Sequence, residues 1–370
     1  MDACLRVIVS SALVSFLTVS AMAQPAASPP APASKPATSP AAPEAGARTR
    51  KQVEDLLVEA EKAQPDWWKS VQPMHPQTLE LTWTTPAPTE RNPNKFLSQY
   101  LQAALRSDAN VWKSTIKTLH LVLTANKDDA EKTRKTDDSL GQFYELLADP
   151  ARAVVWYRKG NQDPASLARC YWGLNCKELA LEACDRVKGD LSGKTVGLLA
   201  AMGELEKAAA LADATAKAGP PEVAYLHAGD ACRWAGQYAA AEALYRKGQQ
   251  SGGTSRPKFV QLAEEAAEAA KIMAALDISK VKDGTYTGTG TRGYRGPITV
   301  QVVVKGGRIL SVRVTDQKED AKYFAIANGV VPTKIVERQG FKGVDTITGA
   351  TISGDTIVAA VAKALASGMK

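Results

Sequence analysis

A short segment near the C-terminus combines hydroxyl side chains with small residues. In the stretch Asp345–Ser353 (DTITGATIS), Gly349 and Ala350 are followed by the hydroxyls of Thr351 and Ser353. A helix is expected directly after them, and the free N–H groups and dipole of a helix N-terminus favour a phosphate. The segment therefore has the chemistry to hold a phosphate beside a hydroxyl. On spacing alone, an ordinary N-cap formed by Ser353 or Thr351 is the simpler interpretation.

Other chemistry-bearing residues are scarce or isolated. The chain has only 3 His, which leaves little material for a His metal centre or a His relay. Two interpretations are open for the cysteines beyond the N-terminal segment, namely disulfides in an oxidising compartment or buried free thiols. No Cys-x-x-Cys-His or Cys-x-x-Cys motif occurs, so covalent haem and a thioredoxin-like dithiol are not indicated. The cysteines concerned are Cys170, Cys176, Cys184 and Cys232.

The elements that must position the hydroxyl segment lie in residues 277–370. After Leu276, glycine becomes frequent and β-branched residues begin to alternate. The pattern predicts a hairpin of two strands, 298–304 and 309–315, around a tight turn at 305–308. We expect a further strand at 283–290 and a short one at 344–347. Helices are expected at 321–328, at 332–340 with Pro332 in the first turn, and at 355–365. This predicts a compact α+β domain.

This segment resembles the FMN-binding domain of the covalently flavinylated subunits of sodium-pumping NADH:quinone reductase and related redox complexes. The resemblance rests on residues 283–286 (DGTY), 293–298 (GYRGPI), the KGGR hairpin and the motif that ends in Thr351. It implies that Thr351 carries FMN through a phosphoester bond. It also implies a separate, Mg-dependent flavin transferase that attaches FMN from FAD outside the cytoplasm. The residues it assigns to cofactor binding are Thr351, Gly349, Ala350, Thr348, Asp345, Ser353, Gly296 and Tyr294.

Within that set, the resemblance gives Asp345 the role of recognition by the transferase, and Ser353 is the alternative acceptor. The sequence departs from the family after the hairpin, where many relatives carry a Glu-Thr-Pro-Gly-like loop and this chain has the charged run 316–322. The residues that contact the flavin ring are therefore not given by the resemblance. Tyr294, Tyr323 and Phe324 are candidates for stacking on the ring and equally for the core.

The middle of the chain, residues 49–276, is rich in helix-forming residues, apart from an irregular stretch at 64–94 that contains prolines and tryptophans. Two segments, 140–160 and 225–248, share small and aromatic residues at the same offsets and end in the same tetrapeptide, Tyr-Arg-Lys-Gly. The second closely resembles a tetratricopeptide repeat. We expect a helical array of the kind that docks a partner protein, although a plain helical spacer fits the same pattern.

The N-terminal segment is typical of an exported protein. Residues 1–23 have a basic residue, a short apolar core and an Ala-Met-Ala cleavage pattern, as in a signal peptide. Residues 24–48 are nearly all Ala, Pro and Ser and predict a disordered linker. We expect no transmembrane segment in the mature chain. The predicted location is the periplasm or the cell envelope.

The position of the excess positive charge along the chain bears on whether the partner is nucleic acid or an anionic cofactor. The chain has 46 Lys+Arg and 39 Asp+Glu, a net charge of +7, which first suggests nucleic acid. Residues 277–370 hold 14 Lys+Arg and 8 Asp+Glu, a balance of +6, so nearly all of the excess lies in the expected flavin domain. No nucleic acid is expected, because export argues against it.

The sequence thus predicts a multidomain protein, an all-α tetratricopeptide-like array followed by a small α+β FMN-binding domain. Its expected function is that of an electron carrier with an unidentified redox partner docked on the helical repeats, rather than a free-standing enzyme. No catalytic residue and no metal site are assigned. The alternatives are a non-redox scaffold whose terminal domain lacks flavin, and a flavin-dependent reductase of a small exported substrate.

Overall fold

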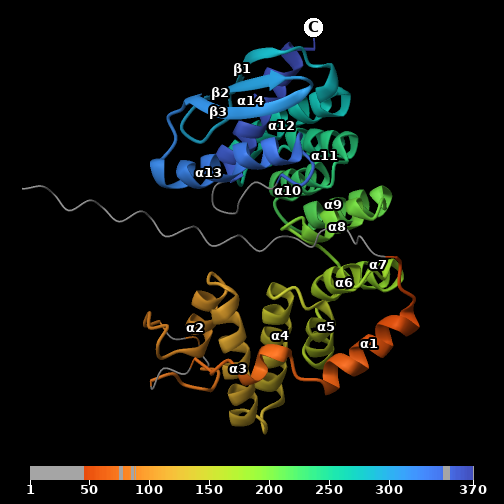
Figure 1. Ribbon diagram of the computed structural model, residues 1–370, viewed down its shortest axis with the longest axis vertical. Helices are drawn as coiled ribbons and strands as arrows, with labels where there is room; N and C mark the ends of the chain where they lie inside the picture. The colour runs from red at the N-terminus through yellow and green to blue at the C-terminus, as the bar shows by residue number, and fades with distance from the viewer. Residues whose placement is uncertain (1–45, 75–77, 85–86, 88, 345–350, 370) are drawn as a thin grey trace, which may run out of the picture. The chain divides into compact units, whose positions relative to one another are not determined.

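The computed structural model describes residues 46–74, 78–84, 87, 89–344 and 351–369, without the side chains of residues 322–323 (Figure 1). The described part is mostly helical, with one small antiparallel sheet near the C-terminus. The signal peptide predicted at 1–23 and nearly all of the linker predicted at 24–48 lie outside the described residues. The stretch 64–94 is mostly irregular where it is described, as its prolines predict.

The helices follow one another from Arg50 to Ala275, and two more flank residues 345–350. Two short 3₁₀ helices, η1 (Asp66–Lys69) and η2 (Ile278–Lys280), accompany them. The α-helices are α1 (Arg50–Lys62), α2 (Leu97–Ala104), α3 (Ala109–Ala125), α4 (Ala130–Leu146), α5 (Pro150–Lys159), α6 (Pro164–Gly173), α7 (Lys177–Cys184), α8 (Lys194–Ala201), α9 (Leu205–Ala218), α10 (Pro221–Trp234), α11 (Tyr238–Gln250), α12 (Pro257–Ala275), α13 (Ala321–Arg338) and α14 (Thr351–Ser367).

Local sequence explains where several of these helices begin. The side chain of Asp149 accepts a hydrogen bond from the N–H of Arg152, and Pro150 occupies the first turn of α5. The pair Asp163 and Pro164 opens α6 in the same way. An aspartate at the cap satisfies a free N–H, and proline there loses no helical hydrogen bond.

Two helix pairs, α4–α5 and α10–α11, share one packing feature. A Cβ added to Gly141 would collide with the ring of Tyr157, and a Cβ added to Gly229 would collide with the ring of Tyr245. Both tyrosines are buried. Each glycine therefore makes room for an aromatic side chain of the next helix, at equivalent positions in the two predicted repeats.

The sheet has the order β1–β2–β3, with β1 (Gly284–Gly290), β2 (Ile298–Lys305) and β3 (Arg308–Asp316) paired antiparallel. The turn between β2 and β3 consists of Gly306 and Gly307, with φ of 59° and 68°. Two consecutive residues at positive φ form the hairpin turn that matches the twist of the strands, and glycine adopts it without strain. The predicted hairpin is confirmed.

One face of the sheet is covered by α14, which packs on β1 and β2, and by α13, which packs on β3 and lies below the strands in Figure 1. Added Cβ atoms on Gly288 and Gly290 of β1 would collide with the backbone of α14 at Ala360 and Thr356. The alternating glycines of β1 thus let the helix approach the strand closely. Residues 353–362 of α14 are all buried, as expected of a helix packed on several sides.

Helix α12 belongs to two hydrophobic cores. Its Leu262, Ala263 and Ala267 pack in the core of the helical array, whereas Ala269 and Met273 pack with the sheet and α14. The buried carboxylate of Glu265 accepts hydrogen bonds from the backbone N–H groups of Thr291 and Arg292, at 2.7 and 3.0 Å. Lys363 of α14 pairs with the same carboxylate at 2.6 Å. The array and the C-terminal part are therefore joined by buried contacts.

Two details differ from the sequence-based expectation, and a third cannot be compared because it lies outside the description. Helix α13 runs through Pro332, because the buried residues Ala327, Val331 and Ile335 continue one apolar stripe across it. Helix α14 starts at Thr351, four residues before the predicted position 355. The short strand predicted at 344–347 falls mostly outside the described residues.

The open question about the cysteines is answered within the described residues, where all four are free thiols in buried positions.

Candidate functional site

The candidate site lies at the start of α14. Thr351 is the first residue of this helix and is partly exposed. The N–H groups of the first helical turn have no acceptor within the helix, and the helix dipole adds positive potential there. The predicted site residues Asp345, Thr348, Gly349 and Ala350 lie outside the described residues. The structure therefore places Thr351 at the N-terminus of a buried helix, directly after them.

Ser353, the alternative acceptor, has different surroundings. Its side chain is buried, with 4% of the residue exposed. Its hydroxyl donates a hydrogen bond to Oε2 of Glu319 at 2.5 Å. A buried hydroxyl already engaged with a carboxylate is a poorer substrate for a separate enzyme than a partly exposed one. The geometry thus distinguishes two hydroxyls that the sequence does not separate.

Glu319 connects three segments of the C-terminal part. Besides the Ser353 hydroxyl, its carboxylate accepts the backbone N–H of Arg295 at 2.7 Å. Gly293 lies against the same carboxylate, and a Cβ there would collide with the carbonyl oxygen of Gly296. The loop 293–296, the residues after β3 and the first turn of α14 therefore meet at one buried side chain. No pattern in the charged run 316–322 singles out Glu319, so the sequence analysis missed it.

The loop 293–296 also presents an aromatic ring to solvent. Tyr294 is 61% exposed, and the Arg295 guanidinium lies 5.7 Å from the centre of its ring. Arg295 in turn pairs with Asp320 at 3.2 Å. Because the loop is tied to Glu319, the exposed ring and the cation belong to the same region as the start of α14. Phe324 packs instead against the domain core, and the side chain of Tyr323 lies outside the description.

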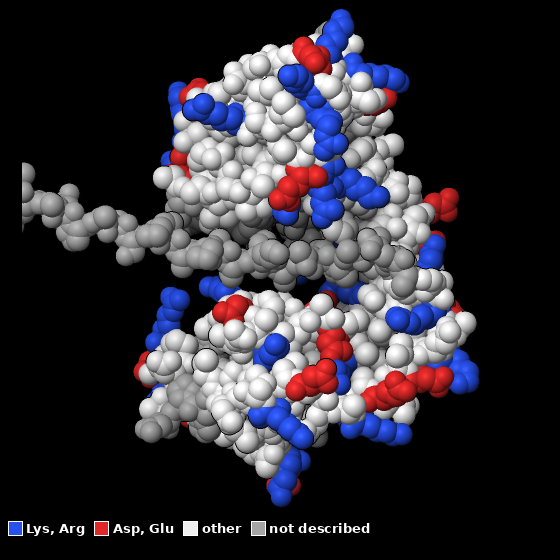
Figure 2. Space-filling model, in the orientation of Figure 1, with Lys and Arg blue, Asp and Glu red and all other residues white. Residues whose placement is uncertain are grey.

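These residues suit a ligand that has an anionic group and a flat ring. The start of α14 favours the anion, and the exposed Tyr294 offers a face on which a ring can stack. The net charge of the C-terminal part is also positive, since residues 277–370 hold 14 Lys+Arg and 8 Asp+Glu. Figure 2 shows where Lys and Arg side chains lie on one face of the molecule. Of the predicted residues, Ser353 and the loop that contains Tyr294 and Gly296 meet at Glu319, and Thr351 lies two positions before Ser353 in α14.

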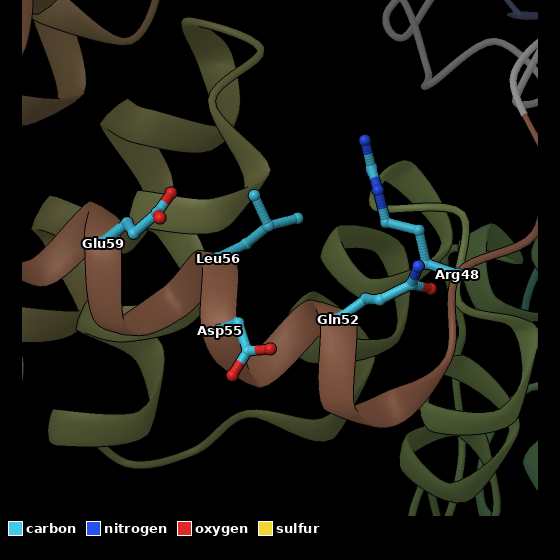
Figure 3. A pocket seen from close by; sticks show the side chains of 5 residues that line it. All are labelled: Arg48, Gln52, Asp55, Leu56 and Glu59. Atoms are coloured by element: carbon cyan, nitrogen blue, oxygen red, sulfur yellow. The ribbon is translucent and has the colours of Figure 1, made fainter.

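Two surface hollows of the described part lie away from this site. One of about 280 Å³ is bordered by Arg48 and by residues of α1, with Arg48 and Leu56 on the same side of the helix and Asp55 pointing away (Figure 3). Another of about 310 Å³ lies around Tyr238, Met273 and Phe341. Neither hollow includes the start of α14 or the loop 293–296.

Comparison with known proteins agrees with the geometry of the C-terminal part. Residues 293–366 match the family model described as FMN-binding domain. The match begins at the loop that carries Tyr294 and ends in α14. Comparisons with curated proteins and with solved structures gave no significant match. The chain therefore contains an FMN-binding domain at its C-terminal end, which supports its interpretation as a flavoprotein.

No helix among the residues that the structure describes is both long enough and apolar enough to cross a bilayer.

Proposed function

We propose that the protein is an extracytoplasmic electron-transfer flavoprotein that carries FMN covalently on Thr351. The observation that supports this most directly is the position of Thr351. It is the last residue of the motif, the first residue of α14, and lies within the matched range 293–366. A phosphate esterified there would lie at the helix N-terminus, where an anion is favoured.

In the attachment step, one P–O bond forms and one P–O bond breaks. The Thr351 hydroxyl oxygen forms a P–O bond to the FMN phosphate of FAD, the pyrophosphate bond breaks, AMP leaves and the hydroxyl proton is released. A flavin transferase would catalyse this exchange and recognise Asp345. No further oxidant or co-reactant is needed, because the pyrophosphate bond of FAD supplies the driving force.

The residues of the chain have binding and orienting roles. The first turn of α14 would hold the phosphate and Tyr294 would offer a face for stacking on the ring, while Glu319 fixes the loop 293–296 against α14. Bound FMN supplies one- or two-electron transfer. No protein acid, base or nucleophile is needed for that transfer, so the protein acts as a carrier rather than as a stand-alone enzyme.

The rest of the chain determines where the flavin domain is located and which redox partner it meets. Residues 1–23 direct export and residues 24–48 form a spacer, which puts the domain in the periplasm or at the cell envelope. The helical array of residues 49–276 is tetratricopeptide-like and docks the redox partner. The equivalent Gly–Tyr contacts in α4–α5 and α10–α11 support a repeat architecture.

The test is co-expression of the exported full chain with a flavin transferase, followed by intact mass and visible absorption. The wild-type chain is expected to gain FMN minus water and to be yellow. Thr351→Val is expected to lose both signals, and Ser353→Ala, the matched control, is expected to keep them. A colourless, unmodified wild-type chain would contradict the proposal and favour the non-redox scaffold.

A further inference from the structure

A buried arginine of the helical array contacts described residues on both sides of Thr351 in the sequence. Arg233 lies near the end of α10 and is only 3% exposed. Its guanidinium donates to the carbonyl oxygen of Val344 at 3.1 Å and to the Asp355 carboxylate at 3.2 Å. Val344 is the last described residue before position 345, and Asp355 lies one turn after Thr351. One guanidinium thus binds Val344 and the second turn of the helix that begins at Thr351.

The surroundings of Arg233 fix its position. The Tyr245 hydroxyl lies 3.4 Å from its Nε and donates a hydrogen bond of 2.7 Å to Asp230. Burial opposes the charge on Arg233, but the neighbouring phenol and two carboxylates raise its pKa, so the guanidinium remains charged. The next residue, Trp234, accepts the N–H of Gly343 at 2.8 Å through its carbonyl oxygen. The last turn of α10 therefore binds two consecutive residues of the approach to the motif.

The energetics of buried ion pairs argue for a role beyond stability. Desolvating an arginine and its carboxylates costs several kcal/mol, and well-packed apolar residues often stabilise a fold as much or more. Such a network instead fixes the relative positions of the groups that it joins, because its hydrogen bonds are directional. Here that geometry connects α10 with Val344 and with the first turns of α14, the helix that begins at Thr351.

We propose that Arg233 is a positioning residue of the flavin site, through which the helical array presents Thr351 for flavinylation. The inference rests on the proposed function. It adds that the flavin transferase needs the helical array as well as the C-terminal domain in order to modify Thr351 efficiently. Arg233 acts through Val344 and Asp355 and need not touch the cofactor.

The experiment compares full-length variants as substrates of purified flavin transferase with FAD, with incorporation followed by mass. Arg233→Met is expected to slow incorporation at least tenfold, and Arg233→Lys to recover part of the rate because it keeps the charge. Asp355→Asn, which removes the negative charge of one anchor with little change of shape, is also expected to slow incorporation. Arg169→Met is the matched control, since Arg169 forms a comparable interhelical pair with Glu145, at 2.7 Å, within the array. It is expected to load at the wild-type rate.

A second readout does not depend on flavin. Amide hydrogen exchange of the unloaded full chains is expected to rise in peptides covering residues 343–356 in Arg233→Met and Asp355→Asn, while the array keeps its protection. A folded Arg233→Met that is loaded at the wild-type rate would overturn this inference and leave the proposed function intact. A wild-type chain that takes up no FMN would overturn both.

Discussion

At the scale of single residues, two hydroxyls only two positions apart have different chemical surroundings. Thr351 is partly exposed at the start of α14, whereas Ser353 is buried and donates to Glu319. The difference arises because Glu319, from a distant part of the chain, reaches the inner side of the first helical turn. On the proposed function, the burial of Ser353 and its bond to Glu319 favour the partly exposed Thr351 as the flavin acceptor.

His120 gives a residue-scale prediction for the array. Its ring lies edge-on to Trp68 and Trp156, with centroids 5.0 and 5.2 Å apart. Burial, with a smaller contribution from the charge of Lys159, lowers its pKa to about 4. Because the folded pKa is below the unfolded value, the stabilisation from neutral His120 is complete above about pH 6.5 and is lost as the pH falls towards 4.

His120→Phe, which keeps an aromatic ring between the tryptophans, is expected to remove this pH dependence. Denaturant unfolding at pH 7 and pH 4 should show the wild-type chain losing about 1–3 kcal/mol more than the variant. Equal losses in the two proteins would show that His120 does not titrate as described. The comparison is made between two pH values for each protein, so a constant packing cost of phenylalanine cancels.

At the scale of elements, glycines control how closely the helices approach. Gly229→Ala puts a methyl group against the buried ring of Tyr245, and overpacking of this kind costs about 1–3 kcal/mol. Gly329, in the exposed face of α13, has no atom near the position of an added Cβ. Gly329→Ala should therefore be neutral or stabilising by about 0.5–1 kcal/mol, because alanine is the better helix former.

Thermal or urea unfolding of the two alanine variants measures this difference. Opposite signs of the change in unfolding free energy are expected. A stability loss of similar size in both variants would show that the contact with Tyr245 is not what makes the substitution at Gly229 costly.

Sequence analysis predicted well those elements whose structure depends on residues that are adjacent in the sequence. The Gly306-Gly307 turn and its flanking strands were predicted correctly, because positive φ and alternation are properties of adjacent residues. Pro332 misled the prediction, because the stripe of buried residues on either side of it outweighs one missing hydrogen bond. The partners of Arg233, at sequence separations of 111 and 122 residues, leave no local pattern and were missed.

At the scale of the whole molecule, charge is distributed unevenly along the chain. Residues 277–370 hold 14 Lys+Arg and 8 Asp+Glu, a balance of +6, and the rest of the chain accounts for +1. A positive field around the flavin site favours anionic reactants and is screened by salt over about 8–10 Å. The partner that exchanges electrons with this domain is thus expected to present an acidic surface.

Small redox reagents test this expectation without a known partner. Oxidation of the reduced, FMN-loaded protein by ferricyanide, an anion, should slow as ionic strength rises. Oxidation by a cationic cobalt(III) ammine should speed up under the same conditions. Stopped-flow absorption follows both reactions. Salt dependence of the same sign for both reagents would contradict a positive field at the flavin.

The central claim is a phosphoester at one residue, and peptide fragmentation tests it most directly. Trypsin cleavage after Lys342 and Lys363 releases residues 343–363, which include Thr346, Thr348, Thr351, Ser353 and Thr356 as possible acceptors. Tandem mass spectrometry of this peptide, from exported chain matured with a flavin transferase, is predicted to place FMN minus water on Thr351. An unmodified peptide, or FMN located on any of the other four hydroxyls, would contradict the account.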